Sequence, residues 1–253
     1  MEKTNKKRKI ALTVKDLKIC YRGLKKFSIK KSLLHPKSSK LEIFEAVKGV
    51  SFELEEGKIL GIIGKNGSGK STMLRSIAGI FSPDSGSIDL HGNSVSLLSI
   101  GVGFQPNLTG YENIFLSGLL LGFSEEEINK KTPEIIEFSE LGDFVYKPVK
   151  TYSSGMYSKL AFSITAILET DIMLIDEVLS VGDIQFKQKS YNKMKELISD
   201  DKRTVIIVSH NNSTIKELCD EVLWIHNGVF QMMGKPDEVL DKYNEFMSDE
   251  NNK

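Results

Sequence analysis

A glycine-rich loop between an apolar run and a helical pattern constrains this chain more than any other feature. Residues 64–72 have the sequence G-K-N-G-S-G-K-S-T and directly follow the apolar run Ile59–Ile63. Helix-spaced apolar residues begin at Met73, and the spacing fits the pattern G-x-x-x-x-G-K-[ST]. Glycines let such a backbone bend so that successive N–H groups point inward, and the following helix adds a favourable dipole for an anion. The sequence therefore predicts a phosphate-binding loop between a buried strand and a helix.

The residue types in this loop suit a nucleoside triphosphate with its magnesium ion. Lys70 offers a point charge to the β- and γ-phosphates, and the Ser71 hydroxyl can reach Mg²⁺. The alternative is a Gly/Ser-rich surface turn, which a match of this length disfavours. We therefore expect the nucleotide to be bound by Gly64, Lys65, Asn66, Gly67, Ser68, Gly69, Lys70, Ser71 and Thr72.

The composition is that of a globular protein that does not cross a membrane by itself. Of 253 residues, 40% are hydrophobic and 27% are charged, and no apolar run approaches the roughly 20 residues that span a bilayer. Cys20 and Cys219 are far apart, which argues against a disulfide framework or a zinc cluster. Because no apolar segment follows the basic N-terminus, we expect no signal peptide and a reducing cytosol.

The charges are distributed unevenly, although the formal net charge is zero. Residues 1–40 contain 14 Lys and Arg against 2 Asp and Glu, which leaves 20 against 32 for the rest of the chain. The basic segment 22–45 also contains apolar residues such as Phe27 and Leu33. It is either an amphipathic piece that contacts anionic lipid, a negatively charged partner or an anionic substrate, or a solvated loop.

Alternating strand and helix patterns predict an α/β fold with a parallel sheet. Continuous apolar runs at 172–175 and 204–208 are typical of parallel strands that are buried on both faces. Residues 10–21 and 47–60 contain short apolar runs broken by turn residues, which predict strands that lead into the phosphate-binding loop. The residues Pro83, Asp84, Ser85 and Gly86 predict a turn.

A small helical lobe is expected over about residues 107–150. Capping-box patterns begin at Thr109 and Ser124, and each is followed by helix-spaced apolar residues. Farther along the chain, Asn227–Gly228 predicts a hairpin turn, and a polar helix is expected from about Pro236.

Polar residues follow the predicted buried strands at their carboxyl ends, where open α/β sheets bind ligands. Asp176 and Glu177 end one run, and Ser209–His210 follow the other. The turn Ser153–Ser154–Gly155 opens a further helix, and its unpaired N–H groups predict a second anion site. Tyr21, at the end of the first strand, is either a residue that stacks on adenine or an ordinary edge-strand aromatic.

Together, the order and spacing of these four motifs resemble the ATP-binding domain of ABC transporters over nearly the whole chain. The resemblance implies one α/β P-loop NTPase domain over residues 1–253, with an antiparallel β subdomain and with ATP and Mg²⁺ bound. It also implies a basic insertion at 22–45 and an inserted helical and signature subdomain at about 100–157, the remainder being nucleotide core.

The same resemblance implies roles for the polar residues. Asp176 would hold Mg²⁺ together with Ser71, and Glu177 would act as general base toward the attacking water. His210 would contact the γ-phosphate. The turn at 153–155 stands where the family has its Leu-Ser-Gly-Gly-Gln signature, and it would cover the ATP of a second copy in a head-to-tail dimer. The alternatives are a structural acidic pair and a capping histidine.

Three strings are similar to one branch of this family, the ATPases that export polysaccharides such as teichoic acids and O-antigens. They are Y-S-S-G-M-Y at 152–157, D-E-V-L-S-V-G-D at 176–183 and G-F-Q-P-N-L-T-G-Y-E-N-I at 103–114. The resemblance implies a peripheral ATPase at the cytoplasmic face of the bacterial membrane, with no nucleic acid partner. It would be bound to a multi-span permease that moves a lipid-linked polysaccharide. Gln105 lies several residues beyond the position of the family's glutamine loop.

Three other hypotheses account for part of the pattern. The ATPase of an importer or drug exporter would be expected to have the Leu-Ser-Gly-Gly-Gln signature and a glutamine loop at the usual position. A non-transport ABC ATPase that acts on DNA or ribosomes would be expected to carry long coiled-coil insertions or two cassettes. A small P-loop kinase would need an acceptor pocket and would lack both the Ser-Gly turn and His210.

Overall fold

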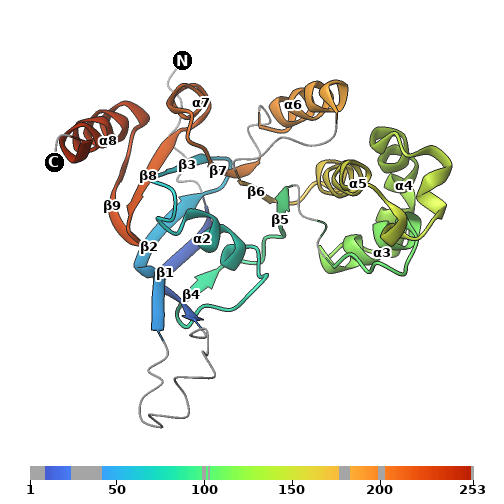
Figure 1. The fold of residues 1–253 in the computed structure, drawn as a ribbon, viewed down its shortest axis with the longest axis horizontal. Helices are drawn as coiled ribbons and strands as arrows, with labels where there is room; N and C mark the ends of the chain where they lie inside the picture. Colours follow the sequence, from blue (N-terminus) through green and yellow to red (C-terminus); the bar gives the residue numbers. More distant parts are fainter. Residues whose placement is uncertain are drawn as a thin grey trace, which may run out of the picture.

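The computed structural model of this chain describes residues 9–23, 42–98, 101, 103–176, 183–198 and 203–251. Figure 1 shows two sheets with their helices and, beside them, a lobe built from α3, α4 and α5. The predicted basic insertion at 22–45 overlaps the ends of two strands, and residues 24–41 of it lie outside the described part of the chain.

A six-stranded sheet in the order β5–β6–β7–β3–β8–β9 forms the core of the fold. Neighbouring strands are parallel except for the last pair, in which β9 runs antiparallel to β8. The predicted parallel sheet and both of its predicted buried strands are therefore confirmed. In spatial order the strands are β5 (Val95–Leu98), β6 (Ile172–Asp176), β7 (Thr204–Val208), β3 (Ile59–Ile63), β8 (Glu221–His226) and β9 (Val229–Gly234).

Alternate side chains along these strands fill hydrophobic cores on the two faces of the sheet. Leu60 and Ile62 of β3 are buried in a core shared with α2 (Lys70–Ile77), whereas Ile63 is buried on the opposite face. Met173 of β6 is likewise buried on that opposite face, in the part of the core formed with α5 and α6. Because both faces are covered, these strands have continuous apolar sequences.

A three-stranded antiparallel sheet in the order β2–β1–β4 shares the core of α2. Its strands are β1 (Ile10–Gly23), β2 (Glu42–Glu55) and β4 (Ser85–Asp89). The pattern at 47–60 belongs to two strands, because a turn at Gly57, with φ of 72°, separates β2 from β3. One sequence prediction in this region is wrong in part: Ser85 and Gly86, predicted in a turn, begin β4, and Ser85 pairs with Lys18 of β1.

The predicted helical lobe is present, and both capping boxes are formed. Thr109 and Ser124 each accept a hydrogen bond from the backbone N–H of the glutamate three residues later, and each glutamate accepts one in return. The helices of the lobe are α3 (Gly110–Leu120), α4 (Glu125–Ser139), α5 (Ser154–Ile167) and two short 3₁₀ helices, Gly142–Tyr146 and Val149–Thr151.

The C-terminal part of the chain covers the second face of the central sheet. Its helices are α6 (Ile184–Ile198), α7 (Asn212–Leu218) and α8 (Pro236–Asn251). The predicted hairpin joins β8 to β9, with Asn227 and Gly228 at φ of 50° and 80°. No helix in the described ranges is long and apolar enough to cross a membrane.

Candidate nucleotide-binding site

Three parallel strands deliver the predicted site residues to one edge of the sheet. β7 lies between β6 and β3, and Val208 is in register with Asp176 on one side and with Ile62 on the other. The phosphate-binding loop follows β3, and Ser209–His210 follow β7. The sheet thus brings together residues that are far apart in the sequence.

Two glycines of the loop are required by close backbone neighbours. Gly69 has φ of 95°, and a Cβ at this position would collide with the carbonyl oxygen of Ala46 on β2. Gly64 has φ of 149°, and its Cβ would collide with the carbonyl oxygen of Ile225 on β8. Gly67 also has a positive φ, of 79°, but a Cβ there would face open space. The loop is therefore held between two strands and is open where Gly67 lies.

Lys70 is buried inside the curve of the loop, with 5% of its surface exposed. Its Nζ donates hydrogen bonds to the carbonyl oxygens of Gly64, at 2.7 Å, and of Lys65, at 2.9 Å. A buried ammonium needs such partners because transfer from water is costly for an unpaired charge. The contacts hold the charge at the start of α2, where the helix dipole also favours an anion.

Ser71 and Asp176, the two predicted Mg²⁺ ligands, are brought together. The Ser71 hydroxyl donates a hydrogen bond to Oδ1 of Asp176 at 2.9 Å. The pair presents a hydroxyl and a carboxylate oxygen, which are the donor types that Mg²⁺ prefers. Glu177, the predicted general base, lies outside the described residues.

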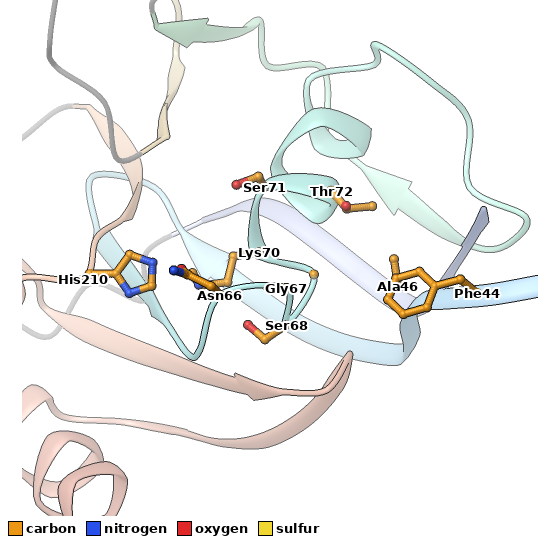
Figure 2. Close-up of a pocket in the computed structure, with 10 residues that line it drawn as sticks. Phe44, Ala46, Asn66, Gly67, Ser68, Lys70, Ser71, Thr72 and His210 are labelled. Atoms are coloured by element: carbon orange, nitrogen blue, oxygen red, sulfur yellow. The ribbon is translucent and has the colours of Figure 1, made fainter. Parts of the chain in front are cut away.

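A cavity of about 230 Å³ lies at the loop. Figure 2 shows His210 and Asn66 at one end of it and Phe44 at the other. Ser68 is buried, with 2% of its surface exposed, and its Oγ has no hydrogen-bond partner among the described residues. An unpaired buried hydroxyl is costly unless a ligand or a water molecule satisfies it. The lining residues are Phe44, Ala46, Asn66, Gly67, Ser68, Gly69, Lys70, Ser71, Thr72 and His210.

Two aromatic residues lie near the start of α2, and only one was predicted. The Tyr21 hydroxyl is 3.2 Å from Oγ1 of Thr72, but Tyr21 does not line the cavity. Phe44 is its register partner on β2, is 60% exposed and does line the cavity. Phe44 was missed because its place at the cavity depends on its pairing with Tyr21 and not on a local sequence pattern.

The signature turn is located on the helical lobe and does not line this cavity. Ser153 is the N-cap of α5, and its side chain accepts a hydrogen bond from the N–H of Met156 at 3.2 Å. Ser154 begins the helix and is exposed, and Gly155 follows. The structure therefore does not bring Ser153, Ser154 and Gly155 to the loop of their own chain.

An ion-pair network links α5 to the end of the 176–183 string. The Lys159 Nζ on α5 is 2.8 Å from a carboxylate oxygen of Asp183 and 3.1 Å from one of Glu140. Hydrogen bonds from Lys159 and from the Phe186 N–H lower the pKa of Asp183 to about 2. Lys189 also pairs with Glu140, at 3.0 Å, so two lysines and two carboxylates join three helices.

Comparison with known proteins gives the family. Residues 47–180 match the family described as ABC transporter. The chain belongs to the ABC transporter family. Among related ABC proteins, it is 45% identical over 217 residues to the teichoic acids export ATP-binding protein TagH of Listeria innocua. It is 44% identical over 206 residues to the O-antigen export system ATP-binding protein RfbB of Myxococcus xanthus.

The lengths of these ABC relatives differ from that of this chain. The alignments cover 86% and 81% of this chain, but only 64% of the Listeria protein and 47% of the Myxococcus protein. The chain thus spans less than two thirds of these relatives. An O-antigen export ATP-binding protein RfbB of Klebsiella pneumoniae is 41% identical, and the alignment covers 87% of this chain and 91% of that protein.

Solved ABC structures have the same fold. A structure described as the ATP-binding subunit of an ABC transporter has a TM-score of 0.69 at 22% identity and covers 92% of this chain and 93% of its own. A dimeric ATP-binding cassette bound to ADP and phosphate has a TM-score of 0.66 at 22% identity. The match covers 89% of this chain and 98% of that cassette. The predicted fold, an ABC nucleotide-binding domain with an antiparallel sheet and a helical subdomain, is therefore confirmed.

Proposed function

We propose that this chain is the ATP-hydrolysing subunit of an ABC transporter that exports a lipid-linked cell-surface polysaccharide of the teichoic acid or O-antigen type. The observation that carries the proposal is the 41–45% identity to named teichoic acid and O-antigen export proteins, one of them matched over 91% of its length. The cavity at the phosphate-binding loop supports it, because it joins a buried lysine to a buried hydroxyl that has no hydrogen-bond partner among the described residues. On this proposal, residues 1–253 act as one ATPase domain.

ATP binds with its phosphates in the loop 64–72. Lys70 is held at the N-terminus of α2 by hydrogen bonds to two carbonyl oxygens, and it supplies the positive charge for the β- and γ-phosphates. The Ser68 hydroxyl gains a partner. Backbone N–H groups of the glycine-rich loop would donate to the phosphate oxygens. Tyr21 and Phe44 lie on neighbouring strands beside the first turn of α2, where an adenine ring can pack against an exposed aromatic side chain.

Mg²⁺ fits the Ser71–Asp176 pair, because a hydroxyl and a carboxylate oxygen are 2.9 Å apart at the end of the loop. The bound ion would neutralise charge that develops on the transferred phosphate. Ser71 would bind it directly, and Asp176 would orient its water shell.

The residues after β6 and β7 carry the hydrolytic step. Glu177 accepts a proton from a water molecule whose oxygen attacks the γ-phosphorus, and the bond to the β–γ bridging oxygen breaks to release ADP. His210 contacts the γ-phosphate from the opposite side of the cavity to Phe44 (Figure 2). Removal of Glu177 should therefore slow hydrolysis much more than it weakens ATP binding.

Two copies complete the sites of each other. Ser153, Ser154 and Gly155 lie on a lobe apart from their own cavity, which supports a head-to-tail dimer in which this turn covers the γ-phosphate of the partner. Closure of the dimer on ATP and reopening after hydrolysis would drive a multi-span permease. The chain would then be peripheral at the cytoplasmic face of the membrane, and the permease would contact the polysaccharide.

The test follows polymer location and complex formation in the same cells. Cells that carry Lys70→Ala or Glu177→Gln should retain lipid-linked polymer inside, while the variant still co-purifies with a permease. Lys130→Ala, at an exposed position of α4, is the control and should leave surface polymer normal. Normal surface polymer in the Lys70→Ala cells would exclude the proposed export function.

A further inference from the structure

The phosphate-binding loop makes a side-chain contact with the last turn of the chain's final helix. The ammonium of Lys65 forms an ion pair with the carboxylate of Glu250 on α8. The two side chains are 37% and 34% exposed, so solvent reaches the pair but does not surround it. Lys65 is the second residue of the loop, and the pair therefore places a carboxylate beside one of the two lysines of the loop, Lys65 and Lys70.

The apolar face of α8 explains why Glu250 reaches the loop. Val239 and Leu240 are buried against the sheet. Tyr243 and Phe246 then pack edge-on against Trp224 of β8, with ring centroids 5.6 Å and 5.2 Å apart. Glu250 follows Phe246 by four residues and so lies on the same face of the helix. The packing that docks α8 on β8 therefore also directs Glu250 to Lys65.

Backbone contacts hold the loop in shape independently of this ion pair. The N–H of Gly228, in the β8–β9 turn, donates to the carbonyl oxygen of Ser68 at 3.1 Å. Figure 2 shows this hairpin passing beside the loop near Ser68. The Ile225 carbonyl packs against Gly64, and Lys70 donates to the carbonyls of Gly64 and Lys65. We therefore expect the Glu250 carboxylate to change the electrostatic potential at the loop more than it changes the conformation of the loop.

We propose that Glu250 is a specificity-determining residue that weakens the binding of polyanions to the phosphate loop by neutralising Lys65. This inference rests on the proposed function, in which the loop binds ATP. A neutralised Lys65 adds no net attraction for the phosphates, whereas a Lys65 without its carboxylate adds one positive charge. The effect is larger for ATP than for ADP, because the ATP phosphates carry more negative charge. Movement of α8 away from β8 would raise nucleotide affinity in the same way.

The experiment measures nucleotide affinity by calorimetry with EDTA present, so that hydrolysis does not interfere. Because the pair is partly solvated, Glu250→Gln should tighten ATP binding by about threefold to tenfold at low salt, with a smaller gain for ADP. Adenosine binding should not change, and 0.5 M NaCl should reduce the gain through screening. Glu245→Gln, at an exposed position on the same helix, is the matched control and should behave as the unmodified chain.

A double-mutant cycle separates a charge effect from a structural one. Lys65→Gln leaves the Glu250 charge beside the loop and should weaken ATP binding, and the combined Lys65→Gln/Glu250→Gln chain should return close to the original affinity. If Glu250→Gln leaves ATP affinity unchanged or weakens it as much as Lys65→Gln does, the proposal is wrong. Emission from Trp224, the single tryptophan, reports whether α8 stays docked in each variant. Failure of the unmodified chain to bind ATP would contradict the proposed function instead.

Discussion

Two glycines of the phosphate-binding loop allow backbone strain to be separated from steric collision. Gly67 and Gly69 both have a left-handed φ, of 79° and 95°. A Cβ at Gly67 would meet nothing within 4 Å, whereas a Cβ at Gly69 would collide with the carbonyl oxygen of Ala46. Alanine at either position therefore introduces the same kind of φ strain, and only alanine at Gly69 displaces the backbone of β2.

The expected costs follow from these contacts. Gly67→Ala should lower the free energy of unfolding by about 1 kcal/mol, because left-handed strain of about 1–2 kcal/mol is partly offset by a less flexible unfolded chain. Gly69→Ala adds an overpacking cost of about 1–3 kcal/mol, so its total should be about 2–4 kcal/mol. In contrast, the new methyl group of Gly67→Ala faces the open cavity, where it should obstruct the nucleotide phosphates.

Urea unfolding and nucleotide titration of both variants test this reasoning. Midpoints at an unchanged m-value give the difference in stability, and the titration is done well below the unfolding transition. Gly67→Ala should be the more stable variant and should still bind nucleotide poorly. Equal losses of stability in the two variants would refute the steric argument, because they would show that φ strain alone sets the cost.

Two further predictions concern helix capping and thiol reactivity. Thr109→Ala should destabilise the protein by about 1 kcal/mol at pH 7, because the N-cap of α3 is lost. Hydrogen bonds from the N–H and hydroxyl of Thr109 lower the pKa of Glu112 in the folded state. Thr109→Ala keeps the N–H bond and removes the hydroxyl bond, so the part of the stability difference that comes from the hydroxyl bond to Glu112 should be lost as the pH falls below the ordinary value of 4.5. A thermal-melting difference between Thr109→Ala and the unmodified chain that does not shrink towards pH 3 would contradict this. Burial raises the pKa of Cys219 to about 12, so iodoacetamide at pH 8 should label Cys219 only after unfolding, whereas the more exposed Cys20 should react in the folded protein. Mass spectrometry of the labelled chain checks the order.

The sequence was most informative where local chemistry determines the structure. The loop at 64–72, the capping boxes at Thr109 and Ser124 and the turn at Asn227–Gly228 each need particular residues at fixed spacing, and the structure has all of them. The apolar runs of β6 and β7 were equally clear, because strands buried on both faces have few polar positions.

Features that depend on distant partners were missed. β4 contains Ser85 and Gly86, which are typical turn residues, and it is a strand because it pairs with β1 about 70 residues earlier. The role of Phe44 at the cavity depends on how β2 passes the loop. Glu250 was missed because no local pattern links a helix end to a loop 185 residues away. The helix signal nevertheless predicted α8 itself from about Pro236.

The cavity is lined by residues that lie far apart in the chain, from Phe44 to His210. Phe44, residues 66–72 of the loop and His210 line it, Asp176 accepts a hydrogen bond from the lining residue Ser71, and Gly228 donates one to the backbone of Ser68. A ribosome that has released only the first two hundred residues has therefore made the phosphate-binding loop but not the site. Nucleotide can stabilise only the finished sheet, by about 2.7 kcal/mol at one hundred times its dissociation constant. In a cell rich in ATP, a newly synthesised chain would therefore bind ATP only after this sheet and its site have formed.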